Sequence, residues 1–186
     1  MVRYQLESLL EPPLRPLKEY FVPFRTRLLL IVAPLLLIID QLSKLYIDRN
    51  FYLGESVTVF ENFFHITYIR NKGAAFGVLS NSPWRVPFFI TIAIVAAVAI
   101  LWYLYSTRGE QKLLQISLVM IFSGAIGNVI DRIRLSEVID FIDVHWFQHH
   151  WPAFNIADSA ITIGVTLMIV ELWLEERRMM KTKLPE

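Results

Sequence analysis

Residues 137–164, EVIDFIDVHWFQHHWPAFNIADSAITIG, run from an aromatic-rich segment into the last long apolar segment of the chain. They contain three aspartates, Asp140, Asp143 and Asp158, and Asp158 lies just inside the apolar segment at about 156–174. A carboxylate at the centre of a membrane helix costs about 2.5–3.5 kcal/mol on insertion scales. What the chain gains from these acids therefore depends on whether this segment spans a membrane.

The composition indicates that it does. The chain is 55% hydrophobic and 19% charged, whereas soluble domains are about 45–50% apolar and about 25% charged. Four segments have roughly the 17–25 apolar residues that a spanning helix needs, at about 28–47, 86–105, 113–131 and 156–174. The fold class expected is therefore an all-α membrane protein with four transmembrane helices, the first of them kinked at Pro34.

Charge and cysteine content exclude several classes of function. The net charge is only +1, which argues against the large basic surface of a charge-driven nucleic-acid-binding protein. It contains no cysteine, which rules out disulfides, a thiolate nucleophile and a zinc site with cysteine ligands.

The distribution of Lys and Arg predicts the orientation in the membrane. These residues are more frequent before the first span, in the 106–112 loop and after the last span than in segments 48–85 and 132–155. The positive-inside rule then places both termini in the cytoplasm. This orientation divides the chain into a cytoplasmic extension (1–25), a membrane domain (26–176) and a cytoplasmic tail (177–186).

The first outer loop is predicted to contain a small β element over about 55–77. SVTVF (56–60) and FFHITYI (63–69) are β-branched and aromatic runs joined by a short turn at Glu61 and Asn62, the pattern of a hairpin. The second outer segment, which holds Asp140 and Asp143, is expected to be a loop.

Polar residues from separate segments gather at one depth of this topology. Asp40 and Lys44 lie in the outer part of the first span, and the others lie in the outer loops or at the outer ends of spans: Asn71, Asn128, Asp131, Arg132, Asp140, Asp143, Asn155 and Asp158. Polar groups from several segments at one depth predict a single site.

Some of these residues also have structural explanations. Asp40 and Lys44 are four residues apart, so they are expected to form an ion pair, which is how membranes tolerate charge. Asp131 and Arg132 are consistent with capping and anchoring the end of a span at the interface.

The same holds for residues nearer the last span. Asn128 is suited to a hydrogen bond between helices. Asn155 and Asp158 are three residues apart, so Asn155 could cap the last helix and the helix dipole would favour Asp158 without catalysis.

The nucleophile that remains after elimination is water. His145 and His149 have the spacing of the zinc-binding HExxH motif, but Trp146 replaces the general-base Glu, so no metal site is expected. No G-x-S-x-G occurs, and Ser123 has no neighbouring His in the sequence. Two aspartates that share one proton can activate water, which is the chemistry of aspartic peptide hydrolysis.

Five blocks of the sequence together resemble one known family, lipoprotein signal peptidase, also called signal peptidase II. The resemblance covers about residues 28–175, with the blocks in order and at sensible spacing: DQLSK (40–44), RNKGAAFG (70–77), GAIGNVIDR (124–132), VIDFIDVHW (138–146) and PAFNIADSAITIG (152–164).

The resemblance implies a bacterial inner-membrane aspartic protease with four spans and an extracytoplasmic β element. The family removes signal peptides from prolipoproteins, cutting before a cysteine that carries a diacylglyceryl group. Carried over by motif, the catalytic pair is Asp140 and Asp158; the residues alone do not select Asp140 over Asp131 or Asp143. The supporting residues that the resemblance implies are Asp40, Lys44, Asn71, Gly73, Asn128, Arg132 and Asn155.

The implied partners are a lipidated prolipoprotein and membrane lipid, with no nucleic acid, and the expected state is a monomer without metal or organic cofactor. The stretch of about 25 residues before the first span is longer than is usual in the family. Two other functions remain open from the residues alone: a proton-coupled membrane carrier that uses Asp40, Asp140 and Asp158, and a non-enzymatic membrane scaffold.

Overall fold

The computed structural model describes residues 22–73 and 79–183. Most of the extension expected over 1–25, the end of the β element expected over 55–77, and the last residues of the expected tail lie outside these ranges.

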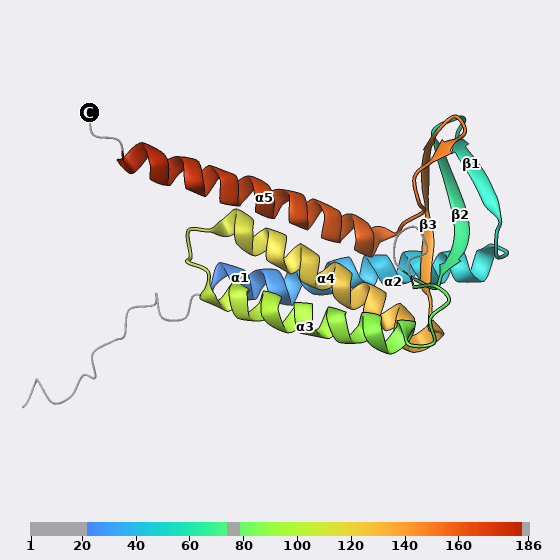
Figure 1. Cartoon of the computed structure of the whole chain (residues 1–186), viewed down its shortest axis with the longest axis horizontal. Helices are drawn as coiled ribbons and strands as arrows, with labels where there is room; N and C mark the ends of the chain where they lie inside the picture. Colours follow the sequence, from blue (N-terminus) through green and yellow to red (C-terminus); the bar gives the residue numbers. More distant parts are fainter. Residues whose placement is uncertain (1–21, 74–78, 184–186) are drawn as a thin grey trace, which may run out of the picture.

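Four helical units form a bundle along one axis, and a small sheet closes one end of it (Figure 1). Each unit is long and apolar enough to cross a membrane, which confirms the four predicted spans. The first consists of α1 (Phe24–Arg27), a π-helical stretch, η4 (Leu28–Val32), and α2 (Ala33–Asn50); the others are α3 (Arg85–Ser106), α4 (Lys112–Leu135) and α5 (Ile156–Lys183).

The π-helical stretch lies immediately before Pro34. Proline has no N–H and cannot donate to the carbonyl one turn earlier, so the helix adjusts locally at this point. The N–H of Ala33 bonds to the carbonyl of Leu28, five residues back, as the wider π turn requires. The predicted disturbance at Pro34 thus takes the form of a π turn just before the proline.

Helix α4 is the centre of the bundle and packs against α2, α3 and α5. Its contact with α5 is close enough to require glycine. A Cβ at Gly124 would lie 2.3 Å from the carbonyl oxygen of Ala157, and one at Gly164 would lie 2.8 Å from that of Ser117. Small residues let helix backbones approach in a membrane, where dispersion contacts replace the hydrophobic effect between helices.

The sheet is antiparallel, with the strand order β1-β2-β3-β4. Its strands are β1 (Ser56–Phe60), β2 (Phe64–Asn71), β3 (Val138–Trp146) and β4 (His149–His150). The β1–β2 pair confirms the predicted hairpin. The loop expected around Asp140 and Asp143 is wrong: this segment is a nine-residue strand that pairs with β2 along most of its length. Its partner lies about seventy residues earlier in the chain, so the pairing has no local signal in the sequence.

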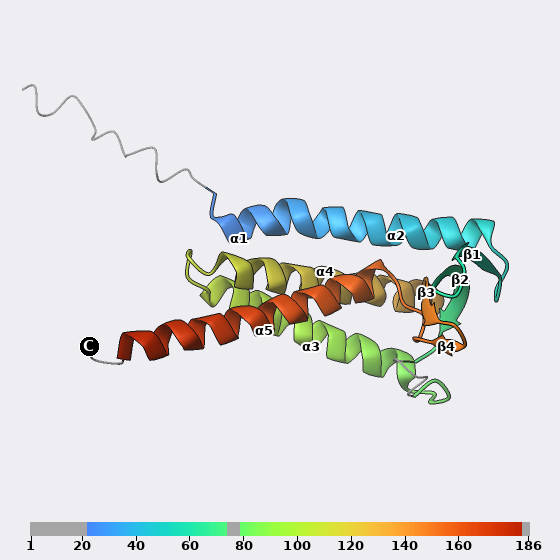
Figure 2. The same cartoon turned by 90° about the horizontal axis from the view of Figure 1, so that it is seen from above.

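The sheet is fixed to the end of the bundle by an apolar cluster of Ile47, Tyr68, Ile139 and Phe141, all buried. At the edge of this cluster the Tyr68 hydroxyl donates to Asp48, and Arg70 pairs with the same carboxylate at 2.7 Å. The strands run across the helix axes, and α1 begins and α5 ends at the opposite end of the bundle (Figures 1 and 2).

The close contact of α4 and α5 predicts the effect of adding one methyl group. Gly124→Ala should lower the stability of the bundle by about 1–3 kcal/mol, the usual range for overpacking, because the new Cβ meets backbone that cannot move alone. Thermal unfolding in detergent measures this loss. Gly109→Ala is the matched control, since nothing lies within 4 Å of its Cβ position. Equal melting temperatures for the two variants would contradict the packing described.

Candidate active site

Helix α5 begins with a reciprocal cap made by two of the predicted site residues. The Asn155 Oδ1 accepts a hydrogen bond from the backbone N–H of Asp158 at 3.0 Å, and the Asp158 carboxylate accepts one from the N–H of Asn155 at 3.2 Å. This is the capping-box arrangement, with an acid three residues after the cap. It confirms Asn155 as the helix cap and fixes Asp158 at the first turn.

Asp140 lies on β3 and is held by two amide side chains. Asn71, at the end of β2, donates to Asp140 Oδ2 at 2.9 Å, and Asn155 donates to Asp140 Oδ1 at 2.7 Å. Only 2% of Asp140 is exposed. Two hydrogen bonds from neutral donors therefore compensate the burial of this carboxyl group.

The structure brings Asp140 and Asp158 to the same pocket. Asn155 bonds to both, since its side chain donates to Asp140 and its backbone N–H donates to Asp158. Burial, followed by the charge of Asp158, raises the pKa of Asp140 to about 7, against the opposing effect of the hydrogen bonds from Asn71 and Asn155. Two carboxyls in such an environment keep a proton between them near neutral pH, so one can act as an acid while the other acts as a base.

Behind the pair, the Lys44 ammonium is fully enclosed by polar partners. It lies 2.9 Å from Asp40 Oδ2 and 3.0 Å from Asp131 Oδ2, and it donates to Asn128 Oδ1 at 3.1 Å. This confirms the predicted ion pair of Asp40 and Lys44. The amide of Asn128 then donates to Asp158 at 2.7 Å, which confirms the predicted hydrogen bond between helices.

Asp131 is one of the polar residues that the sequence places at the depth of the site, but it is not among the predicted supporting residues. The expectation that it anchors a span at the interface is wrong, because it is 1% exposed and bonds to Lys44 inside the bundle. Its position three residues after Asn128 was the available signal, but that spacing also suits a helix end.

The two carboxylates beside Lys44 each hold the backbone just before one member of the pair. Asp131 accepts from the N–H of Ile139 at 3.3 Å, and Asp40 accepts from the N–H of Ala157 at 2.8 Å. Gln41 donates to both carboxylates. The Lys44 network therefore sets the relative positions of β3 and α5, on which Asp140 and Asp158 lie.

The pocket in front of the pair is about 690 Å³ and has apolar and polar walls. The Arg132 guanidinium lies 4.8 Å from the ring of Phe89 on α3 and donates to the carbonyl of Gly73 at 3.1 Å, while Gly73 donates its N–H to Asn71. Six of the sequence-predicted residues line the pocket: Asn71, Gly73, Asn128, Arg132, Asp140 and Asp158. Asp40, Lys44 and Asn155 lie behind it. Wall residues not found from the sequence include Trp151, Phe154 and Thr162.

Asp143, the third candidate aspartate, and the histidines near it lie outside the pocket. Asp143 pairs with His150 at 2.9 Å and does not line the pocket. His145 and His149 lie on two paired strands, and not on one helix face as the HExxH motif requires.

Fold and site together define a multi-pass membrane protein with a carboxylate pair at a pocket, the class of a membrane aspartic hydrolase. The comparison with known families agrees: the model of signal peptidase (SPase) II matches residues 32–174. The chain belongs to the signal peptidase II family, and it is a peptidase of the aspartic type.

Curated relatives and solved structures support this assignment. The lipoprotein signal peptidase of Geobacter metallireducens is 52% identical over 155 residues, which cover 83% of this chain and 96% of the relative. That of Syntrophotalea carbinolica is 50% identical over 147 residues, 79% of this chain and 91% of the relative. A bacterial membrane enzyme solved by the in meso method at 2.3 Å is similar with a TM-score of 0.75 and 35% identity, over 85% of this chain and 92% of that chain. Another, at 1.9 Å, has a TM-score of 0.70 and 38% identity, over 77% and 91%.

Removal of the buried ammonium tests the network behind the pair. Lys44→Met should destabilise the protein by about 3–5 kcal/mol, because Asp40 and Asp131 would remain buried without a counter-charge. Chemical unfolding in detergent measures the loss. Lys72→Met is the control, because Lys72 is 56% exposed and lies 3.8 Å from Glu137. A Lys44→Met protein as stable as this control would show that the network does not hold the fold.

The hydrogen bond from Asn71 predicts a shift in the pH profile. Asn71→Ala removes a donor that favours the ionised form of Asp140, so the pKa of Asp140 should rise and its limb of the kcat/KM profile should move up by about one pH unit. The acid limb moves if Asp140 is the base, and the alkaline limb moves if it is the acid. Asn50→Ala, at the exposed end of α2, is the control. Two unmoved limbs would contradict the assignment of Asp140.

Proposed function

We propose that this protein removes signal peptides from diacylglyceryl-modified prolipoproteins by cutting before the lipidated cysteine, and that Asp140 and Asp158 activate the water that attacks. The observation that carries the proposal is the meeting of these two carboxyls at one pocket, with Asn155 bonded to both. Membership of the signal peptidase II family supplies the class of reaction and of substrate.

The chemistry needs a proton on one carboxyl and a charge on the other. The charged member takes a proton from water, which attacks the scissile carbonyl, while the protonated member donates its proton to the carbonyl oxygen. As the C–N bond breaks, the first carboxyl passes the proton from water to the leaving amine, and the second takes its proton back from the tetrahedral intermediate. The pair titrates as a unit. Arg132, which lines the same pocket, supplies positive charge near the oxyanion that forms. The proposal requires no metal or organic cofactor.

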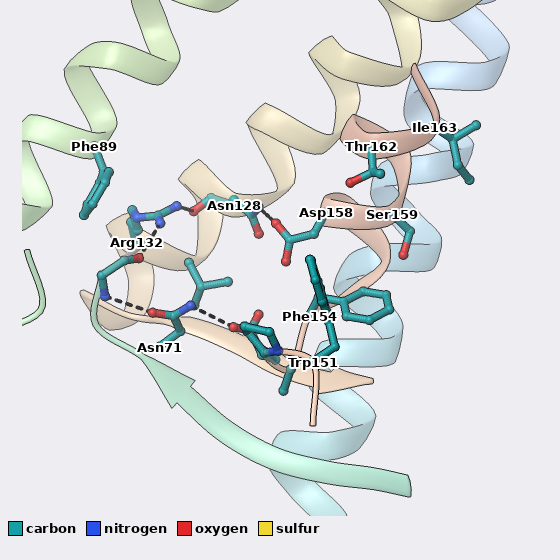
Figure 3. Close-up of a pocket in the computed structure, with 15 residues that line it drawn as sticks. Asn71, Phe89, Asn128, Arg132, Trp151, Phe154, Asp158, Ser159, Thr162 and Ile163 are labelled. Carbon is teal, nitrogen blue, oxygen red and sulfur yellow. Dashed lines mark hydrogen bonds between the residues drawn. The ribbon is translucent and has the colours of Figure 1, made fainter. Parts of the chain in front are cut away.

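The substrate enters sideways from the bilayer in this proposal. The pocket is lined by Phe89 from α3 and by Thr162 and Ile163 from α5, on either side of α4 (Figure 3). Its apolar wall suits a signal-peptide segment that stays in the membrane, and the acyl chains of the lipidated cysteine remain in lipid. The enzyme acts as a monomer.

The proposed location is the bacterial inner membrane, with the pocket and the sheet at the outer face. The excess of Lys and Arg at the opposite end supports this orientation, because α1 begins and α5 ends there (Figure 1). Both termini, including the extension over 1–25 and the tail over 177–186, then lie in the cytoplasm, and the β element belongs to the first outer loop.

The two rival functions fit the site less well. A proton carrier needs polar groups across the whole membrane, but among the described residues the buried charges lie near the sheet except for Glu171. A scaffold gives no reason to hold a desolvated carboxyl pair at an open pocket, which costs stability.

Substitution of each aspartate tests the proposal. Asp140→Asn and Asp158→Asn should each lower kcat by roughly 10³-fold or more, measured on a lipidated prolipoprotein with purified enzyme in detergent. The lost group can then neither give nor take the proton. Glu137→Gln, three residues before Asp140 on the sheet side, should keep its activity. Cleavage that survives either aspartate change would rule out the pair, and proton flux in liposomes without cleavage would favour the carrier.

A further inference from the structure

A second polar cluster lies at the far end of β3, beyond the pocket. It consists of His65 on β2, Asp143 and His145 on β3, and His150 on β4. The register of the sheet brings them together, since His65 is opposite Asp143 and His145 is opposite His150. The proposed catalysis does not use these side chains, which are called the histidine cluster below.

The contacts of His145 and His65 leave one proton for the two nitrogens that face each other. The Nδ1 of His145 lies 3.0 Å from the carbonyl oxygen of Phe147, so this nitrogen is the donor. Its Nε2 lies 3.2 Å from the Nε2 of His65, and this contact is a hydrogen bond only if one of the two nitrogens carries a proton and the other does not. If His65 and His145 were both fully protonated, two N–H groups would face each other across this contact. Because His145 is 6% exposed, water cannot relieve that contact while the strands stay paired.

The close stacking of the imidazole rings also limits the positive charge that the histidine cluster can hold. The rings of His145 and His150 are stacked at 4.5 Å with an angle of 12° between their planes, and the rings of His65 and His145 are 4.3 Å apart. Asp143 is the carboxylate of the cluster and lies 2.9 Å from His150 and 3.7 Å from His65. One positive imidazole is offset by this carboxylate, but two or three at these distances repel one another.

The residues around the histidine cluster provide little additional charge to offset its positive imidazoles. The other titratable side chains in the adjoining strand and turn are Glu61 and His149, and both are exposed to solvent. Arg70 lies toward the other end of β2 and is occupied by Asp48.

The histidine cluster is continuous with the outer wall of the pocket. Residues 151–154 follow β4 directly, and all four line the pocket. The N–H of Trp151 donates to the carbonyl of Val144 at 2.9 Å, and Phe154 exchanges hydrogen bonds with Ile142 at 2.8 and 3.0 Å. The wall is therefore held to β3 by these hydrogen bonds and, through the residues before it, by the pairing of β4 with β3.

We propose that the histidine cluster is a pH-sensitive latch on the substrate pocket. With at most one charged imidazole the latch holds β4 and the wall over 151–154 against β3; with two or more it releases them. The latch regulates the site of the proposed function and in that respect rests on it.

The direction of the pH effect on the closed form follows from proton binding. The open form accepts protons that the closed form excludes, so the closed form loses stability as the pH falls. Imidazole is the side chain that changes charge between about pH 5 and 8. Each excluded proton favours opening about tenfold per pH unit below that transition. The wall should therefore be ordered at pH 7.5 and loosened at pH 5.

Hydrogen–deuterium exchange tests the latch without any cleavage. In full-length Asp140→Asn protein in detergent, the protection of the 145–151 amides, corrected for intrinsic exchange at each pH, should fall about tenfold or more between pH 7.5 and pH 5. The double variant His65→Gln, His150→Asn should lose this dependence, because it leaves one imidazole in the cluster. His149→Gln, the exposed neighbour, should keep it. Protection that does not change with pH in the Asp140→Asn protein, or that changes equally in all variants, would overturn the latch.

Steady-state kinetics of the active enzyme give the second readout. Acidification should raise the KM for a lipidated prolipoprotein in the wild type more than in the double variant, since the wall contacts substrate. An equal rise in both proteins would count against the latch. If no cleavage occurs at any pH, the proposed function fails while the exchange experiment still decides the latch.

Discussion

The rest of the site depends on one buried ammonium group. Lys44 is 2% exposed in the middle of the bundle, where an unpaired charge would be prohibitive, and it is held by Asp40, Asp131 and Asn128. Asp40 and Asp131 in turn bind the backbone immediately before Asp158 and Asp140. A single charge thus joins α2, α4, α5 and the sheet. None of these elements can shift without leaving a buried charge unpaired, which explains how the carboxyl pair keeps its geometry in a thin bundle.

The carboxyl pair itself is the least compensated part of this arrangement. Asp140 is desolvated and faces the charge of Asp158, and its pKa is raised to about 7 in spite of two hydrogen bonds from asparagines. The burial of this carboxyl group lowers the stability of the fold, and its raised pKa favours acid–base chemistry near neutral pH. Asn155 resolves part of the conflict, because it caps α5, holds Asp158 through its backbone and donates to Asp140 through its side chain. Structural and functional roles coincide in this residue.

Local patterns made much of the protein predictable. Span lengths follow from apolar runs, because no backbone group can remain unsatisfied in lipid. The Asp40–Lys44 pair follows from a spacing of four, and the cap of Asn155 from a spacing of three. The hairpin of β1 and β2 follows from two β-branched runs and a short turn. The strand character of 138–146 did not follow, because its partner is distant in the chain and its acids interrupt the apolar pattern. The burial of Asp131 was also missed, since its partner Lys44 lies on another helix.

The sequence by itself determined the four spans, the cap of the last helix and, by resemblance, the family, since these depend on residues close together in the chain or on motifs in order. Only the tertiary structure decided which acids meet. Asp131, Asp140 and Asp143 are not distinguished by residue type. In the structure, however, Asp131 pairs with Lys44, Asp140 faces the pocket and Asp143 faces histidines. Alternation along β3 turns residues 140 and 143 to opposite faces of the sheet, and helix packing buries residue 131. Long-range pairing therefore gives similar side chains different chemistry.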